Sequence, residues 1–169
     1  MVGMTLGTGL GAGIVIDGTL YSGANCGAGE IGAIPYKDHS VEHYCAGAFF
    51  KEIAGEAGDT VYARARQGDP AAIRHFGAYG YELGYAVMIA LYAYDPEIIV
   101  LGGSISKAFD LFEGGLRQRL ESYDYQHALE RTRITESRTE NVAVLGAAAL
   151  CLDALGRDAR GAGTPEAGG

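Results

Sequence analysis

The sequence predicts an α/β fold in which a mixed β-sheet is flanked by helices, and three stretches of the chain predict it. Residues 1–22 hold two apolar β-type runs around a Gly-Thr-Gly turn, followed by Asp17-Gly18, a pattern typical of antiparallel strands. Residues 97–101 form a short, apolar run, as expected for a parallel strand covered by helices on both faces. The helical periodicity before this run extends over about 24 residues.

The amino-terminal part of the chain is predicted to be mainly β-structure. In chain order, we expect strands over residues 1–5, 12–17, 19–22 and 33–36, with a loop over 25–32 and a polar connection over 37–41. The first strand starts almost at Met1, with nothing before it to form a neighbour. We therefore expect the chain to begin inside a larger architecture.

Helices are predicted to dominate between residues 42 and 94. One lies within 42–58, and a short helix follows from its cap Asp59 to residue 67. The long helix begins at Asp69-Pro70, because Asp is a good N-cap and proline suits the first helical position, and it ends at Tyr94. Its small residues predict that another element packs closely against it: Gly77, Gly80, Gly84 and Ala90.

The strand at 97–101 leads into a second candidate contact. Ligands of open α/β sheets bind at the carboxyl ends of such strands, which here carry Gly102, Gly103 and Ser104. A plain β-to-α turn is the alternative interpretation. Ser104 or Ser106 is expected to cap the helix that follows.

The carboxyl-terminal elements complete one domain over residues 1–155. We expect a helix over 107–122, a strand over 131–136 and a last helix over 141–155. Residues 156–169 lack apolar periodicity and are predicted to be a disordered tail.

Composition and charge exclude several classes of function. The chain is 48% hydrophobic with a formal net charge of −8 and no block of Lys or Arg, which argues against nucleic-acid and anionic-membrane partners. It shows no signal peptide and no apolar run of the ~18 residues that a membrane span needs, so a cytoplasmic location is expected. Cys26, Cys45 and Cys151 lack metal or redox spacing and are interpreted as reduced thiols.

The glycine-rich turn near the amino terminus is the first candidate site. Glycines at 7, 9, 11 and 13 remove β-carbons, so an anion can approach backbone N–H groups and the Thr8 hydroxyl. No Gly-Lys-Ser/Thr follows, and a strand rather than a helix comes next, which excludes the Walker and dinucleotide patterns. The alternatives are a phosphate-binding loop and a simple tight hairpin.

Three motifs in order resemble the carboxyl-terminal half of the ROK family, named for repressors, open reading frames and sugar kinases: LGTGLGAGIVIDGTLYSGANCGAGEIG, DPEIIVLGGSIS and ENVAVLGAAAL. The resemblance implies a ribonuclease-H-like ATPase lobe of the actin and hexokinase type, in which two lobes enclose ATP with Mg²⁺ and a sugar. It also implies two groups of ATP-binding residues, Gly7, Thr8 and Gly9 at the phosphates and Gly102, Gly103 and Ser104 on the adenosine side.

The same resemblance implies a sugar site but no zinc site. Glu30 and Glu42 match the family's two sugar-binding glutamates, with solvated loop carboxylates as the alternative. The family's zinc-binding His is replaced by Ala33 and its cysteine-rich loop is absent, so we expect no zinc and no other metal held by this chain alone. His39 or His43 could replace the missing imidazole, or both could be surface residues.

No catalytic residue is assigned in this chain. Family kinases carry an Asp-x-Gly-x-Thr motif and an Asn-Asp pair with the catalytic base in their amino-terminal half, and neither motif occurs here. The resemblance therefore implies the carboxyl-terminal lobe of a glucokinase-like, ATP-dependent hexose kinase that is inactive without its other lobe. A sugar-sensing lobe of a ROK transcriptional regulator and a non-catalytic, homo-oligomeric assembly module are the alternatives.

Overall fold

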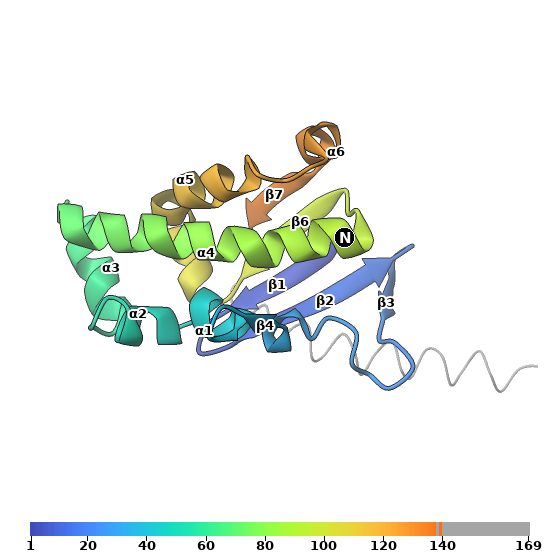
Figure 1. The fold of residues 1–169 in the computed structure, drawn as a ribbon, viewed down its shortest axis with the longest axis horizontal. Coiled ribbons are helices and arrows are strands. Elements are labelled where there is room, and N and C mark those ends of the chain that lie inside the picture. The colour runs from blue at the N-terminus through green and yellow to red at the C-terminus, as the bar shows by residue number, and fades with distance from the viewer. Residues whose placement is uncertain (138, 140–169) are drawn as a thin grey trace, which may run out of the picture. The chain divides into compact units, whose positions relative to one another are not determined.

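A mixed β-sheet forms the centre of the computed structural model, which describes residues 1–137 and 139 (Figure 1). Within this part of the chain, the strand order is β3-β2-β1-β6-β7, with bounds Thr19–Tyr21, Leu10–Ile16, Val2–Leu6, Ile98–Gly102 and Arg133–Glu136. Strand β1 is central and pairs antiparallel with β2 and parallel with β6. The predicted mixed sheet is confirmed.

Helices and a small hairpin connect these strands. The helices are α1 (Val41–Cys45), α2 (Ala48–Glu52), α3 (Gly58–Arg66), α4 (Pro70–Tyr94), α5 (Phe109–Leu120) and α6 (Gln126–Arg131), with 3₁₀ turns η1 (Ile31–Ala33) and η2 (Ile105–Ala108). The hairpin pairs β4 (Pro35–Tyr36) with β5 (His39–Ser40). Within the described range, no helix combines the length and apolarity that a membrane span requires.

Helix α4 begins and ends where its sequence predicts. The Asp69 side chain accepts a hydrogen bond from the N–H of Ala71 at 2.8 Å, and Pro70 occupies the first helical position. At the other end, Asp95 adopts a left-handed conformation with φ of 42° before Pro96 prevents continuation. The helix lies across the sheet (Figure 1).

The core lies between one face of the sheet and the helices. Alternate residues of the two central strands are buried on this face: Val2, Met4 and Leu6 in β1, and Ile99 and Leu101 in β6. The residues between them in β1, Gly3 and Thr5, are partly or fully exposed. The helix expected over 141–155 and the tail expected over 156–169 lie outside the described residues.

Glycines bring α4 and α5 into backbone contact. A β-carbon on Gly80 would lie 2.0 Å from the Phe112 carbonyl oxygen, and one on Gly84 would lie 2.5 Å from the Arg119 β-carbon. The predicted close packing on α4 is confirmed, and the packed element is α5. Because these glycines contact α5 of the same chain, they are no longer evidence that α4 packs against a second copy of the chain.

Several local predictions were wrong at element boundaries. The helix expected within 42–58 is divided into α1 and α2, and residues 31–33 form a 3₁₀ turn before a strand of only two residues. Asp59 does not cap α3, because Ala57 occupies the N-cap position and no side chain bonds there. Helix α6 was not predicted.

Candidate functional site

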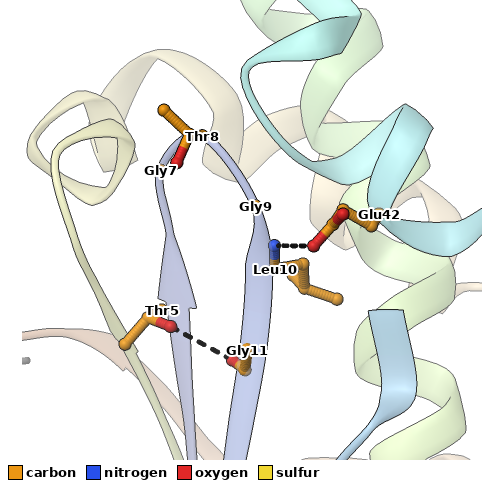
Figure 2. Close-up of a pocket in the computed structure, with 7 residues that line it drawn as sticks. All are labelled: Thr5, Gly7, Thr8, Gly9, Leu10, Gly11 and Glu42. Carbon is orange, nitrogen blue, oxygen red and sulfur yellow. Dashed lines mark hydrogen bonds between the residues drawn. The ribbon is translucent and has the colours of Figure 1, made fainter. Parts of the chain in front are cut away.

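The glycine hairpin that joins β1 to β2 is the first part of the site. Gly7 donates its backbone N–H to the Gly9 carbonyl at 3.1 Å, which leaves Thr8 at the tip (Figure 2). Among the described residues, no hydrogen bond takes the backbone N–H of Thr8 or Gly9. Two amide donors and one hydroxyl are therefore available at the tip for an anionic or polar ligand.

A pocket of about 370 Å³ opens beside this hairpin. It is lined by Thr5, Gly7, Thr8, Gly9, Leu10, Gly11 and Glu42, all of which are drawn in Figure 2. The Thr5 hydroxyl donates to the Gly11 carbonyl at 3.4 Å, across the two strands. The pocket lining combines residues predicted to bind ATP, which lie on the hairpin, with Glu42, which is predicted to bind sugar and lies on another element.

Glu42 reaches the hairpin from helix α1. Ser40 caps this short helix by accepting the N–H of His43 at 3.4 Å. One carboxylate oxygen of Glu42 (Oε2) accepts the backbone N–H of Leu10 at 2.8 Å, a charge-assisted hydrogen bond (Figure 2). The other oxygen and the remaining lone pairs can accept further hydrogen bonds from hydroxyl groups of a ligand.

Glu30 lies next to this arrangement but does not line the pocket. It is exposed and precedes η1 at its N-cap position. The η1 turn itself packs closely, because a β-carbon on Gly32 would lie 2.6 Å from the Leu10 carbonyl oxygen and 3.3 Å from the Glu42 β-carbon. The two predicted sugar-binding glutamates are thus carried by elements in contact, and their role remains a prediction.

The second predicted ATP motif adjoins the hairpin. Gly102 ends β6, and Gly103 has a φ of +93° and packs on β1, where a β-carbon would lie 2.3 Å from the Leu6 carbonyl oxygen. A β-carbon on Gly7 would lie 3.9 Å from the Ser104 hydroxyl oxygen, so the two motifs are neighbours. Their role in binding ATP is still a prediction.

The two serines do not cap the helix as predicted. Ser104 precedes η2 without a side-chain cap bond, and the Ser106 hydroxyl donates to the Gly103 carbonyl at 2.8 Å. A 3₁₀ turn lies between the strand and α5, so neither serine reaches the first turn of α5. The Ser106 bond instead fixes the left-handed Gly103.

The β4-β5 hairpin occupies the place of the connection predicted over 37–41. Lys37 forms an ion pair with Glu82 of α4 at 2.6 Å, and the Tyr36 ring stacks on Tyr85 at 4.1 Å. Burial, together with the negative charge of Glu82, raises the pKa of Tyr36 to about 12. These contacts fix the start of α1, which carries Glu42.

The two histidines considered as replacements for the missing imidazole lie together outside the pocket lining. Their rings stack at 3.9 Å, and the His43 Nε2 atom lies 3.2 Å from a carboxylate oxygen of Glu52. In the part of the chain that the structure describes, no group of three or more His, Cys, Asp or Glu side chains is arranged to hold a metal ion.

Sequence reasoning missed the role of Gly47 at the break between α1 and α2. Its N–H donates to the Gly7 carbonyl at 2.8 Å, and a β-carbon there would lie 3.2 Å from the same oxygen. The sequence signal for this break is the pair Ala46-Gly47 inside an expected helix. Ala46 adopts an extended conformation, which ends α1 and brings the Gly47 N–H to Gly7.

Comparisons with known proteins identify the family to which a chain with this fold belongs. The ROK family profile matches residues 1–154, so the chain belongs to the ROK family. Its ribonuclease-H-like fold, of the actin and hexokinase type, is that of ROK sugar kinase structures.

Two curated relatives illustrate the similarity. The N-acetylgalactosamine kinase AgaK of Shewanella sp. (strain ANA-3) is 38% identical over 66% of this chain and 44% of the relative. The glucokinase of Pyrobaculum calidifontis is 32% identical over 73% of this chain and 48% of the relative. The chain thus spans about half the length of the curated relatives it matches.

Solved structures extend the similarity to three dimensions. A protein of Cytophaga hutchinsonii described as a sugar kinase superimposes with a TM-score of 0.77 and 26% identity, covering 89% of this chain and 57% of that protein. A ROK family transcriptional regulator, described as a homologue of the E. coli MLC protein, gives a TM-score of 0.73 at 26% identity, over 82% of this chain and 41% of the regulator.

Proposed function

We propose that this chain supplies the carboxyl-terminal lobe of an ATP-dependent hexose kinase of the ROK family. The observation that carries the proposal is the pocket in which the free N–H groups of the glycine hairpin lie beside the Glu42 carboxylate. The phosphoryl donor, ATP, and the acceptor, a sugar hydroxyl, would there be held next to each other, which phosphoryl transfer to a sugar requires. The similarity to sugar kinases supports this class.

The polar groups of the hairpin fit the phosphates of ATP. The N–H groups of Thr8 and Gly9 and the Thr8 hydroxyl are donors, and a glycine on each side of Thr8 leaves room for the phosphate oxygens. The motif from Gly102 to Ser104 adjoins this tip and would contact the adenosine side. The divalent metal that kinases of this family use with ATP would lower the repulsion between phosphates and carboxylate.

The carboxylates fit a sugar. Glu42 keeps one hydrogen bond to Leu10 and has acceptor capacity left for sugar hydroxyls, and Glu30 is carried by the neighbouring turn. Deprotonation of the attacking hydroxyl needs a general base, and we place that base outside these residues. Alone, the chain should bind its ligands weakly and transfer no phosphoryl group.

Binding measurements on the 169-residue chain test this proposal. Amide chemical shifts would be followed during titration with glucose or N-acetylgalactosamine, and separately with ATP and Mg²⁺. Sugar should perturb Leu10, and nucleotide should perturb Thr8 and Gly9. Replacing Glu42 by Gln should weaken sugar binding about tenfold, since a hydrogen bond to a charged group is lost.

Glu113→Gln serves as the matched control. Glu113 pairs with Arg117 on the surface of α5, so its replacement should leave both titrations unchanged. Sugar-dependent ADP production by the isolated chain would contradict the proposal that the base lies elsewhere. Failure of both ligands to perturb the hairpin would contradict the binding function itself.

A regulatory lobe is the second candidate, supported by the similarity to a ROK transcriptional regulator. The two functions differ in their ligands. A regulator that senses sugar needs the Glu42 side of the pocket but has no need of nucleotide at the Thr8 tip. Sugar binding without any response to ATP would therefore favour the regulator.

A further inference from the structure

The segment from Glu42 to Gly47 contacts the glycine hairpin at both of its ends. On the β2 side, the Glu42 carboxylate accepts the Leu10 N–H at 2.8 Å. On the β1 side, the Gly47 N–H donates to the Gly7 carbonyl at 2.8 Å. The tip at Thr8 lies between these two bonds, so one short segment determines where its free N–H groups point.

This segment is in turn anchored to the core. The fully buried Tyr79 of α4 donates its hydroxyl to the Cys45 carbonyl at 2.9 Å, at the end of α1. Burial makes this bond costly to break, because the carbonyl would be left without a partner. The hairpin is therefore held against a fixed support rather than against a mobile loop.

We propose that Gly47 is a positioning residue, and that it and Glu42 form a clamp that couples sugar binding to nucleotide binding. The proposal rests on the proposed function. A sugar hydroxyl bound to the free oxygen of Glu42 restrains the carboxylate. The carboxylate then holds Leu10 and the hairpin in the position that binds the nucleotide phosphates. By linkage, nucleotide at the tip strengthens sugar binding by the same factor.

The clamp requires an N–H at position 47, which a proline lacks. Gly47 has a φ of −59°, which suits proline, and Ala46 before it is extended with φ of −130°. The dihedral angles of residues 46 and 47 therefore accept a proline, which removes the donor and sets its ring Cδ against the Gly7 carbonyl oxygen, so that the hydrogen bond is lost and the hairpin is released at this end. Gly47→Ala is its matched control, because it adds the same β-carbon but keeps the N–H.

Hydrogen exchange of the free 169-residue chain gives the first readout. We expect the Gly7 and Leu10 amides to exchange about tenfold faster in Gly47→Pro than in Gly47→Ala, because the hairpin loses one of its two restraints. Equal exchange in the two variants would overturn the clamp. This readout needs no ligand, so it decides the clamp even where the proposed function fails.

Ligand affinity gives the second readout, with glucose or N-acetylgalactosamine and an ATP analogue that cannot be hydrolysed. Saturating sugar should tighten nucleotide binding about fivefold in the wild type and in Gly47→Ala, at the lower end of typical couplings. In Gly47→Pro the factor should fall to about one. A factor that survives in Gly47→Pro would overturn the coupling. Absence of all binding in the wild type would overturn the proposed function instead.

Discussion

The contact between α4 and α5 yields a prediction for two adjacent glycines of α5. A β-carbon on Gly115 would lie 1.9 Å from the Gly77 carbonyl oxygen and 3.0 Å from the Tyr81 backbone nitrogen. A carbon atom needs about 3.5 Å from such neighbours, so the helices would have to separate. A β-carbon on Gly114 would meet nothing within 4 Å.

The magnitudes follow from these distances. Alanine in a helix is about 1 kcal/mol more favourable than glycine, and Gly114→Ala should gain most of this. Gly115→Ala gains the same helical preference but forces two packed backbones apart. This overpacking should cost about 3 kcal/mol, the upper end of the typical range. We expect Gly115→Ala to lower the free energy of unfolding by about 2 kcal/mol.

Urea unfolding of the two variants and the wild type, followed by circular dichroism, measures both effects. The variants should differ by about 3 kcal/mol, with the wild type between them. Equal slopes against urea concentration would show that the denatured states are comparable. Variants that agree within about 0.5 kcal/mol would refute the close helix contact.

Three further predictions concern the site and single side chains. Gly9→Ala should weaken sugar binding about tenfold, since its β-carbon would lie 2.6 Å from the Glu42 carboxylate and displace it from Leu10, and a sugar titration measures this. Iodoacetamide at pH ~7.5 should label the exposed Cys26 before the buried Cys45, whose thiol pKa is raised well above its usual range by burial, as peptide mapping would reveal. The hydrogen bond from Arg64 lowers the pKa of Asp69, so the stabilising effect of this pair is present above pH 3.8 and is lost as the pH falls through the lowered value. Asp110 has a lowered pKa as well, so thermal unfolding between pH 5 and pH 2 should show a loss of stability in both proteins, with a smaller loss in Asp69→Asn than in the wild type.

Local signals explain what the sequence could predict. The bounds of α4 follow from Asp69-Pro70 and Asp95-Pro96, and the hairpin of β1 and β2 follows from alternating apolar residues around glycine. The two glycine motifs were found for the same reason, because each follows directly on a strand. The two motifs lie next to each other because β1 pairs with β6, and the sequence does not reveal that order of strands.

Long-range contacts explain what the sequence could not predict. The break at Gly47 depends on a hydrogen bond to Gly7, far away in the chain, and the local pair Ala46-Gly47 does not indicate that partner. The bond between Glu42 and Leu10 is likewise set by packing of η1 and α1 on β2. The serine caps failed because a left-handed Gly103 accepts the Ser106 hydroxyl before the helix begins.

The glycine contact between α4 and α5 has a mechanical consequence. Helix α4 leads into β6, and α5 follows the Gly102-Gly103-Ser104 turn after η2, so β6 and the turn lie in the chain between two helices whose backbones touch. Helices that touch through glycines have little freedom to slide, so the position of the turn is fixed relative to α4 and α5. A ligand that contacts both this turn and the Thr8 tip would therefore meet a rigid surface on the side of the turn.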